Sequence, residues 1–145
     1  MKRIVLPIAV AIAAGAIAVS AALAASPTVK LASRGSLGKI IVNGRGFTAY
    51  AFTADSRNKD VCVKRAGCTG IWPPLTTKGK PVAGPGLKRR LLGTIKLNGG
   101  RRQVTYAGHP LYRYAFDTPG ATDYVGISEF GGKWLALTAS GHLVK

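Results

Sequence analysis

Acidic side chains are scarce in this 145-residue chain. It has 5 Asp and Glu residues against 21 Lys and Arg, which gives a formal charge of +16. Because 47% of the residues are hydrophobic, the chain is not a disordered basic tail, and we expect a folded domain. A folded domain with this imbalance attracts polyanions, so the candidate partners are nucleic acid, anionic cell-wall polymers and anionic lipid head groups.

Long apolar runs are absent beyond the N-terminal segment, so no later part of the chain is predicted to span a membrane. Residues 1–24 have the pattern of a signal peptide, with a basic start, an Ala-rich apolar run and the small-x-small sequence Ala22-Leu23-Ala24. A retained membrane anchor is the alternative, because the apolar run is long enough to cross a bilayer. Loss of the leader removes two basic residues, Lys2 and Arg3, and leaves 19 basic against 5 acidic residues.

Cysteine is nearly absent too. Cys62 and Cys68 are the only two, and an even pair in an exported protein predicts a disulfide. The alternative is a metal site that adds His109 and His142, although these histidines lack zinc-finger spacing. No Cys lies near the end of the apolar segment, so we expect no lipid anchor.

The chain does contain an internal duplication. LGKIIVNG at 37–44 matches LGTIKLNG at 92–99, YAFTAD at 50–55 matches YRYAFD at 112–117, and WPPLTTKG at 72–79 matches WLALTASG at 134–141. The last two matches share an offset of 62 residues and the first has an offset of 55, so the second copy carries an insertion near RRQVTYA. The predicted organisation is a flexible lead-in at 25–36, repeat 1 at 37–79, a basic Gly/Pro linker at 80–90, and repeat 2 at 91–145.

Each copy is predicted to be β. In TIKLN, Ile95 and Leu97 alternate with polar residues, which is the period of a strand with one buried face. Asn-Gly pairs follow as turn signals, and no part of the chain after the leader has a convincing helical period. We therefore expect an all-β chain of short antiparallel strands that forms one compact sandwich- or barrel-like domain.

These motifs resemble a known family. YAFTAD and YRYAFD fit the Tyr-x-(Phe/Trp/Tyr)-x-x-Asp motif of a bacterial secreted-repeat family, whose members are also described as predicted lipoproteins. The resemblance covers about residues 36–141 and implies a secreted or envelope-attached bacterial protein of two tandem β repeats without an established biochemical activity. The chain departs from the family because it lacks the lipidation Cys of many members and because its two cysteines lie further apart.

The repeat motif supplies most of the candidate site residues, which are Tyr50, Phe52, Asp55, Trp72, Tyr112, Tyr114, Asp117 and Trp134. The two aspartates could be general bases or cation ligands, but the favoured interpretation is that each accepts backbone N–H bonds at a turn. The two tryptophans could form a carbohydrate platform, but matched Trp residues in short β repeats favour core anchors.

His109 has no counterpart in repeat 1 and is the one further candidate for a ligand or metal site. Its alternative role is that of a turn residue before Pro110. No catalytic residue and no cofactor are predicted, because no nucleophile–base pair, no phosphate-binding Gly motif and no second recurrent carboxylate is visible. The sequence does not indicate which metal a site at His109 would bind.

The basic residues cluster at Lys88, Arg89, Arg90, Arg101 and Arg102. Export and the lack of a stacking-aromatic motif argue against nucleic acid as the partner. We therefore expect an exported, non-enzymatic envelope or extracellular protein that binds anionic envelope polymers and meets a membrane only through an uncleaved leader. The alternative is a metal-binding or redox-associated envelope protein that uses His109 and the motif aspartates.

Overall fold

A computed structural model describes residue 26 and residues 28–145. The predicted signal peptide at residues 1–24 lies outside the described residues. In the described part, no helix is both long and apolar enough to cross a membrane.

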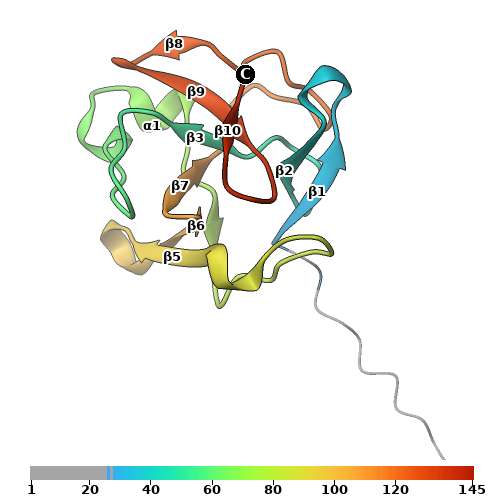
Figure 1. The fold of residues 1–145 in the computed structure, drawn as a ribbon. Coiled ribbons are helices and arrows are strands. Elements are labelled where there is room, and N and C mark those ends of the chain that lie inside the picture. Colours follow the sequence, from blue (N-terminus) through green and yellow to red (C-terminus); the bar gives the residue numbers. More distant parts are fainter. Residues whose placement is uncertain (1–25, 27) are drawn as a thin grey trace, which may run out of the picture.

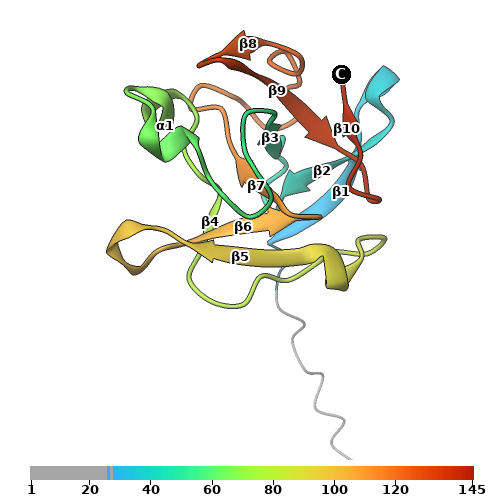
Figure 2. The same cartoon turned by 60° about the vertical axis from the view of Figure 1, so that its left-hand side comes forward.

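The described residues form a succession of short strands, shown in two views in Figures 1 and 2. The first half contains β1 (Val29–Ser33), β2 (Lys39–Asn43), β3 (Tyr50–Phe52), the short helix α1 (Cys68–Ile71) and β4 (Thr76–Thr77). The second half contains β5 (Leu92–Lys96), β6 (Arg102–Tyr106), β7 (His109–Tyr112), β8 (Ser128–Glu129), β9 (Gly132–Leu137) and β10 (Leu143–Val144).

All strand pairs in these elements are antiparallel. β1 and β2 form a two-stranded sheet, and the larger sheet runs in the order β10-β9-β3-β7-β6-β4, with β5 on β6 and β8 on β9. The predicted all-β class is confirmed, and of its two forms the sandwich-like one fits, because the sheets do not close into a barrel.

The two repeats are interlocked rather than separate lobes. β3 of repeat 1 pairs with β9 of repeat 2, so that Phe52 faces Trp134. The matched segment of repeat 2 pairs in return with repeat 1, through a bridge between Tyr112 and Pro74. Each half therefore completes its strand pairing with residues of the other half.

Matched hydrogen bonds show that the two pairings are equivalent. The Thr53 N–H donates to the Lys133 carbonyl at 2.9 Å, and the Ala115 N–H donates to the Ile71 carbonyl at 2.8 Å. Both positions in the second bond are related to those in the first by the offset of 62 residues. Tyr50 and Tyr112 themselves lie opposite each other in the β3–β7 register, at the centre of this approximate two-fold arrangement.

The insertion predicted near RRQVTYA forms strand β6. β6 pairs with β5 on one side and with β4 and β7 on the other, so it ties repeat 2 to the end of repeat 1. Its residue Val104 joins the largest buried cluster, together with Ile41 and Leu111.

The predicted flexible lead-in at 25–36 is wrong at residues 29–33. Val29–Ser33 form β1, which pairs along its whole length with β2. Val29 is fully buried, and its burial in the main core supplies the driving force for this strand. This strand was not predicted because it begins only a few residues after the apolar leader.

The linker at 80–90 is partly buried. Gly84 and Leu87 are buried, and Arg89–Leu91 form a turn of 3₁₀ helix. Gly84 lies so close to β1 that a Cβ there would meet Lys30 Cβ at 2.8 Å, so glycine allows the linker to pack against this strand. The linker is thus part of the fold.

Candidate functional site

The two motif tryptophans form the centre of an aromatic cluster. The Trp72 and Trp134 rings are stacked, with centroids 4.0 Å apart and an angle of 2° between their planes. Tyr50 meets Trp72 edge-on at 5.1 Å, and Tyr112 meets Trp134 in the same way at 5.1 Å. All four rings are fully buried, as the core-anchor interpretation predicts, and no sugar-binding platform is formed by the tryptophans.

The motif tyrosines and aspartates are joined reciprocally across the two repeats. The Tyr50 hydroxyl donates to Asp117 Oδ2 at 2.8 Å, and the Tyr112 hydroxyl donates to Asp55 Oδ2 at 2.8 Å. Each bond therefore links the tyrosine of one copy to the aspartate of the other. A buried phenol needs an acceptor, and the matched carboxylate supplies it from the opposite repeat.

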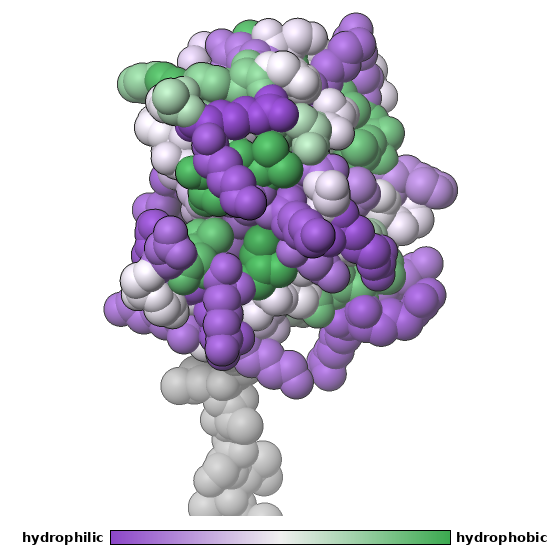
Figure 3. All heavy atoms as spheres, turned by 90° about the vertical axis from the view of Figure 1, so that its left-hand side faces the viewer, coloured by the Kyte–Doolittle hydropathy of each residue, from purple (hydrophilic) through white to green (hydrophobic). Residues whose placement is uncertain are grey.

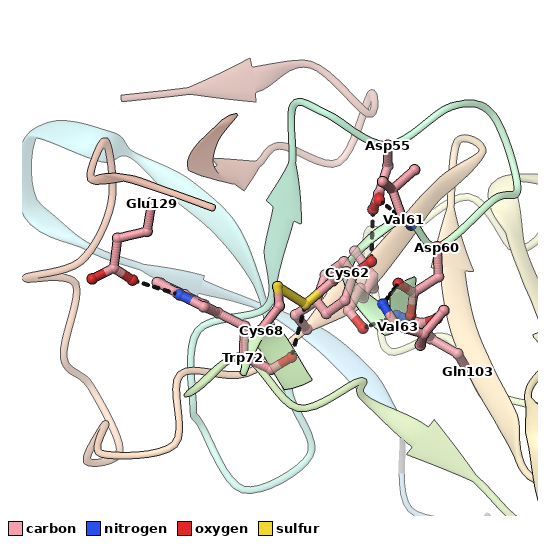
Figure 4. Close-up of a disulfide and its surroundings, with 11 residues drawn as sticks. Asp55, Asp60, Val61, Cys62, Val63, Cys68, Trp72, Gln103 and Glu129 are labelled. Atoms are coloured by element: carbon pink, nitrogen blue, oxygen red, sulfur yellow. Dashed lines mark hydrogen bonds between the residues drawn. A yellow bond between two sulfur atoms is a disulfide. The ribbon is translucent and has the colours of Figure 1, made fainter. Parts of the chain in front are cut away.

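Asp55 also has the turn role that we expected from the sequence. Its second oxygen, Oδ1, accepts the Val61 N–H at 2.8 Å (Figure 4). Burial raises the pKa of Asp55 to about 6, although the bonds from Val61 and Tyr112 act in the opposite direction. Burial likewise raises the pKa of Asp117, with Asp123 adding to the effect.

The tyrosines are held in the neutral form. Burial raises the pKa of Tyr50 and of Tyr112 far above the ordinary range, and the neighbouring aspartates add to this effect. Both phenols therefore keep their protons and act as hydrogen-bond donors to the aspartates. The Tyr–Asp pairs behave as structural ties between the repeats.

Glu129 was not predicted from the sequence as a site residue. Its Oε2 accepts the Trp72 indole N–H at 2.8 Å (Figure 4). The indole nitrogen of Trp134 is buried without a partner. The two indoles differ because repeat 1 has no residue equivalent to Glu129. The matched position is Gly67, which has no side chain to accept the Trp134 indole N–H.

The five acidic residues of the chain all gather around this cluster. Asp55, Asp117 and Glu129 accept bonds from Tyr112, Tyr50 and Trp72. The other two lie close by, since Asp60 raises the pKa of Tyr112 and Asp123 raises that of Tyr50. The sequence contains no other Asp or Glu, so the rest of the protein's charged surface is basic.

The predicted disulfide between Cys62 and Cys68 is present, with the two Cα atoms 5.4 Å apart (Figure 4). Both cysteines are fully buried in the aromatic cluster beside Trp72. The bridge closes the loop that leads into α1 and so fixes the entry to the Trp72 segment. In repeat 2 the matched positions are Tyr124 and Phe130, which are partly buried against the same cluster.

His109 begins β7 and lies opposite Tyr106 in a tight hairpin. Burial lowers its pKa, and the positive charge of Arg57 lowers it further. Within residues 26 and 28–145, no three His, Cys, Asp or Glu side chains are grouped so that they could hold a metal ion. His109 therefore lies at the start of a strand, and the motif aspartates do not join it in a group that could hold a metal ion.

Two of the predicted basic-patch residues, Arg89 and Arg102, line a cleft of about 900 Å³ together with Lys78 and Lys80. Arg101 lines a second cleft of about 600 Å³ with Lys59, Lys64 and Lys96. Lys88 and Arg90 are exposed and line neither cleft. The basic residues are therefore divided between two neighbouring hollows.

Tyr114 and Phe116, which follow β7, differ in burial. β7 ends at Tyr112, and Phe116 lies in the turn that follows, with 70% of its surface exposed. Tyr114 packs against Trp72, with their centroids 4.9 Å apart. At the 62-residue offset their counterparts are Phe52 and the small Ala54, so only the first position holds an aromatic side chain in both repeats.

The architecture is that of a duplicated, interlocked β repeat. Residues 93–138 match the model of a family described as a secreted repeat of unknown function. This match includes the Tyr112, Asp117 and Trp134 positions, so the resemblance inferred from the motifs is confirmed for repeat 2. No curated protein and no solved structure matches the chain.

Proposed function

We propose that this protein is a non-enzymatic module of the cell envelope or extracellular space that binds anionic envelope polymers through its charge. The family match supports an extracellular repeat protein of uncharacterised activity. The proposal adds the partner and the mode of binding. It also places the protein outside the cell without a lipid anchor.

The separation of charges supports this function most strongly. All five carboxylates gather around the aromatic cluster, where three of them accept bonds from buried phenol or indole groups. Arg65 and Arg113 act on the motif aspartates and lower their pKa values. Because 19 basic residues face 5 acidic ones after loss of the leader, the surface carries a net positive field, which attracts polyanions at long range.

Figure 3 shows the hydropathy of one face of the molecule. Hydrophilic residues spread across it around small apolar patches, and the same side carries α1 and one end of β5 in Figure 1. A basic protein binds a flexible polyanion mainly through its charged groups, with affinity that depends on salt.

The test measures binding of the purified protein to immobilised polygalacturonate at increasing NaCl concentrations. We expect the affinity to fall steeply with salt, because binding releases counterions from the polymer. Fully methyl-esterified polygalacturonate is the matched neutral control and should bind at least tenfold more weakly at low salt. Absence of binding at low salt, or binding that salt does not change, would contradict the proposed function.

A further inference from the structure

The larger basic cleft joins residues from two parts of the chain. One wall is the segment from Lys78 to Ala83, and the other is formed by the start of β5 with Arg89 and Arg102. Lys78, Lys80, Arg89 and Arg102 are all exposed at this cleft, and no acidic residue lines it. The cleft therefore carries four cations without a carboxylate to neutralise them.

Hydrogen bonds to the first strand region hold the end of the first wall in place. The Thr28 N–H donates to the Val82 carbonyl at 2.8 Å, and the Val82 N–H donates to Thr28 Oγ1 at 2.9 Å. The Gly84 N–H donates to the Val29 carbonyl at 2.8 Å. The backbone at this end of the cleft is therefore positioned before any ligand binds, which limits the cost of binding.

The floor of the cleft is partly apolar. Pro81, Val82 and Leu92 are half-buried and line it between the cations. An apolar floor suits the carbon face of a sugar ring or polyol, whereas the planar guanidinium groups of Arg89 and Arg102 suit oxyanions that can accept two hydrogen bonds. The chemistry thus fits a carbon chain that bears anionic groups better than it fits a bare ion.

The second basic cleft continues along the same strand. β5 and the residues after it line the first cleft with Leu92, Gly93 and Thr94, and the second cleft with residues 95–98. Seven residues of extended chain span roughly 20 Å. Two clefts that both carry cations along this length can contact successive groups of a linear polymer.

We infer that the cleft lined by Lys78, Lys80, Arg89 and Arg102 is the main binding site for a linear polymer that carries repeated phosphate or carboxylate groups. This inference rests on the proposed function and assigns it to one place on the surface. The second cleft extends the contact along β5.

The experiment compares two variants that each lose two positive charges. Lys78→Gln with Lys80→Gln alters the cleft, whereas Lys39→Gln with Lys133→Gln alters two exposed lysines that line neither cleft. Binding is measured with polygalacturonate and with polyphosphate over a range of salt concentrations, after circular dichroism has shown that both variants are folded.

The cleft variant should lose at least tenfold in affinity at low salt, and its log–log salt slope should become shallower by about two. The control variant should lose less than threefold. Equal losses in the two variants would overturn the cleft assignment and leave charge-driven binding intact. Absence of salt-dependent binding by the unchanged protein would overturn both proposals.

Small anions complete the test. Galacturonic acid and inorganic phosphate, at the same concentration of charged groups, should not displace the polymers. Displacement by either monomer with equal potency would show a small-anion site and overturn the inference of a polymer site.

Discussion

Repeats 1 and 2 contribute matched residues to one aromatic cluster, which we call the aromatic frame. The groups that pack beside the two tryptophans differ between the repeats. Beside Trp72, repeat 1 places the Cys62–Cys68 disulfide. At the matched positions repeat 2 has Tyr124 and Phe130, which pack against the cluster without a covalent bond. Large aromatic side chains in repeat 2 thus occupy the positions that the disulfide occupies in repeat 1.

The polar groups show the same contrast. Asp55 has partners for both oxygens, whereas Asp117 accepts the Tyr50 bond with one oxygen and has its other oxygen buried without a partner. The Trp72 indole has Glu129 as a partner, and the Trp134 indole has none. In both matched pairs the repeat 1 group has all its partners, and the repeat 2 group lacks one. What is common to both copies is the frame, and the differences mark where each copy has diverged.

The largest effect should come from breaking the shared stack. Trp72→Ala and Trp134→Ala should each lower the free energy of unfolding by about 3–5 kcal/mol, because each removes a fully buried indole. The double variant should lose less than the sum, since the two rings contact each other. Urea unfolding followed by near-ultraviolet circular dichroism measures this, with exposed Phe116→Ala as a control that should change little. Additive losses would contradict a shared stack.

The disulfide should have the next largest effect. Replacing Cys62 and Cys68 together by Ala should lower the free energy of unfolding by about 2 kcal/mol, as expected for a short closed loop. The variant should remain folded, because repeat 2 holds the matched positions without a disulfide. Urea unfolding of the variant beside the unchanged protein measures the loss. Complete unfolding of the variant would show that repeat 1 depends on its disulfide in a way that repeat 2 does not.

The reciprocal bonds should have a smaller and unequal effect. Tyr112→Phe and Tyr50→Phe should each cost about 1–2 kcal/mol, since each leaves a half-buried carboxylate without its phenol donor. Tyr50→Phe should cost more, because Asp117 then loses its one side-chain donor, whereas Asp55 keeps the Val61 N–H. Thermal and urea unfolding of the two variants in parallel would reveal the difference. Equal costs would show that the Val61 bond does not matter.

The pH dependence should be the smallest effect. The pKa of Asp55 is about 6 in the folded protein and about 3.8 in the unfolded chain, so the folded state binds the proton more tightly. Its contribution to stability is therefore full below pH 4 and is lost as the pH rises through about 6. Partial exposure to solvent limits the change to about 1 kcal/mol.

Asp55→Asn removes this titration. The difference in the free energy of unfolding between the unchanged protein and the variant should fall between pH 4 and pH 7.5. Asp117, whose pKa is also raised, remains in both proteins and cancels in the comparison. A difference that stays constant or grows with pH would contradict the raised pKa of Asp55.

Much of this structure could be predicted from the sequence. The duplication, the all-β class, the disulfide and the buried tryptophans follow from spacing and residue type. The interlocking could not be predicted, because a strand motif such as YAFTAD specifies which face is buried but not which copy supplies its partner. The Tyr50–Asp117 pairing depends on that choice of partner, so it was hidden as well.

The Asn-Gly turn signals are correct in both copies. The chain reverses directly after Asn43, whose N–H donates to the Phe47 carbonyl at 2.8 Å, and Asn98–Gly100 form the turn between β5 and β6. One local feature escaped prediction for another reason. Glu129 carried no recognisable motif, because its role is visible only when the Trp72 ring lies beside it. Side chains that act across the two copies leave little trace in the sequence of either copy.

The central claim is that each repeat completes the core of the other, and cutting the linker tests it most directly. A specific protease site inserted between the exposed residues Lys88 and Arg89 allows the folded protein to be nicked. The two fragments should stay together on gel filtration, keep the near-ultraviolet signal of the Trp72–Trp134 stack, and separate only in denaturant. Fragments that separate under native conditions, with each one remaining folded, would contradict the claim.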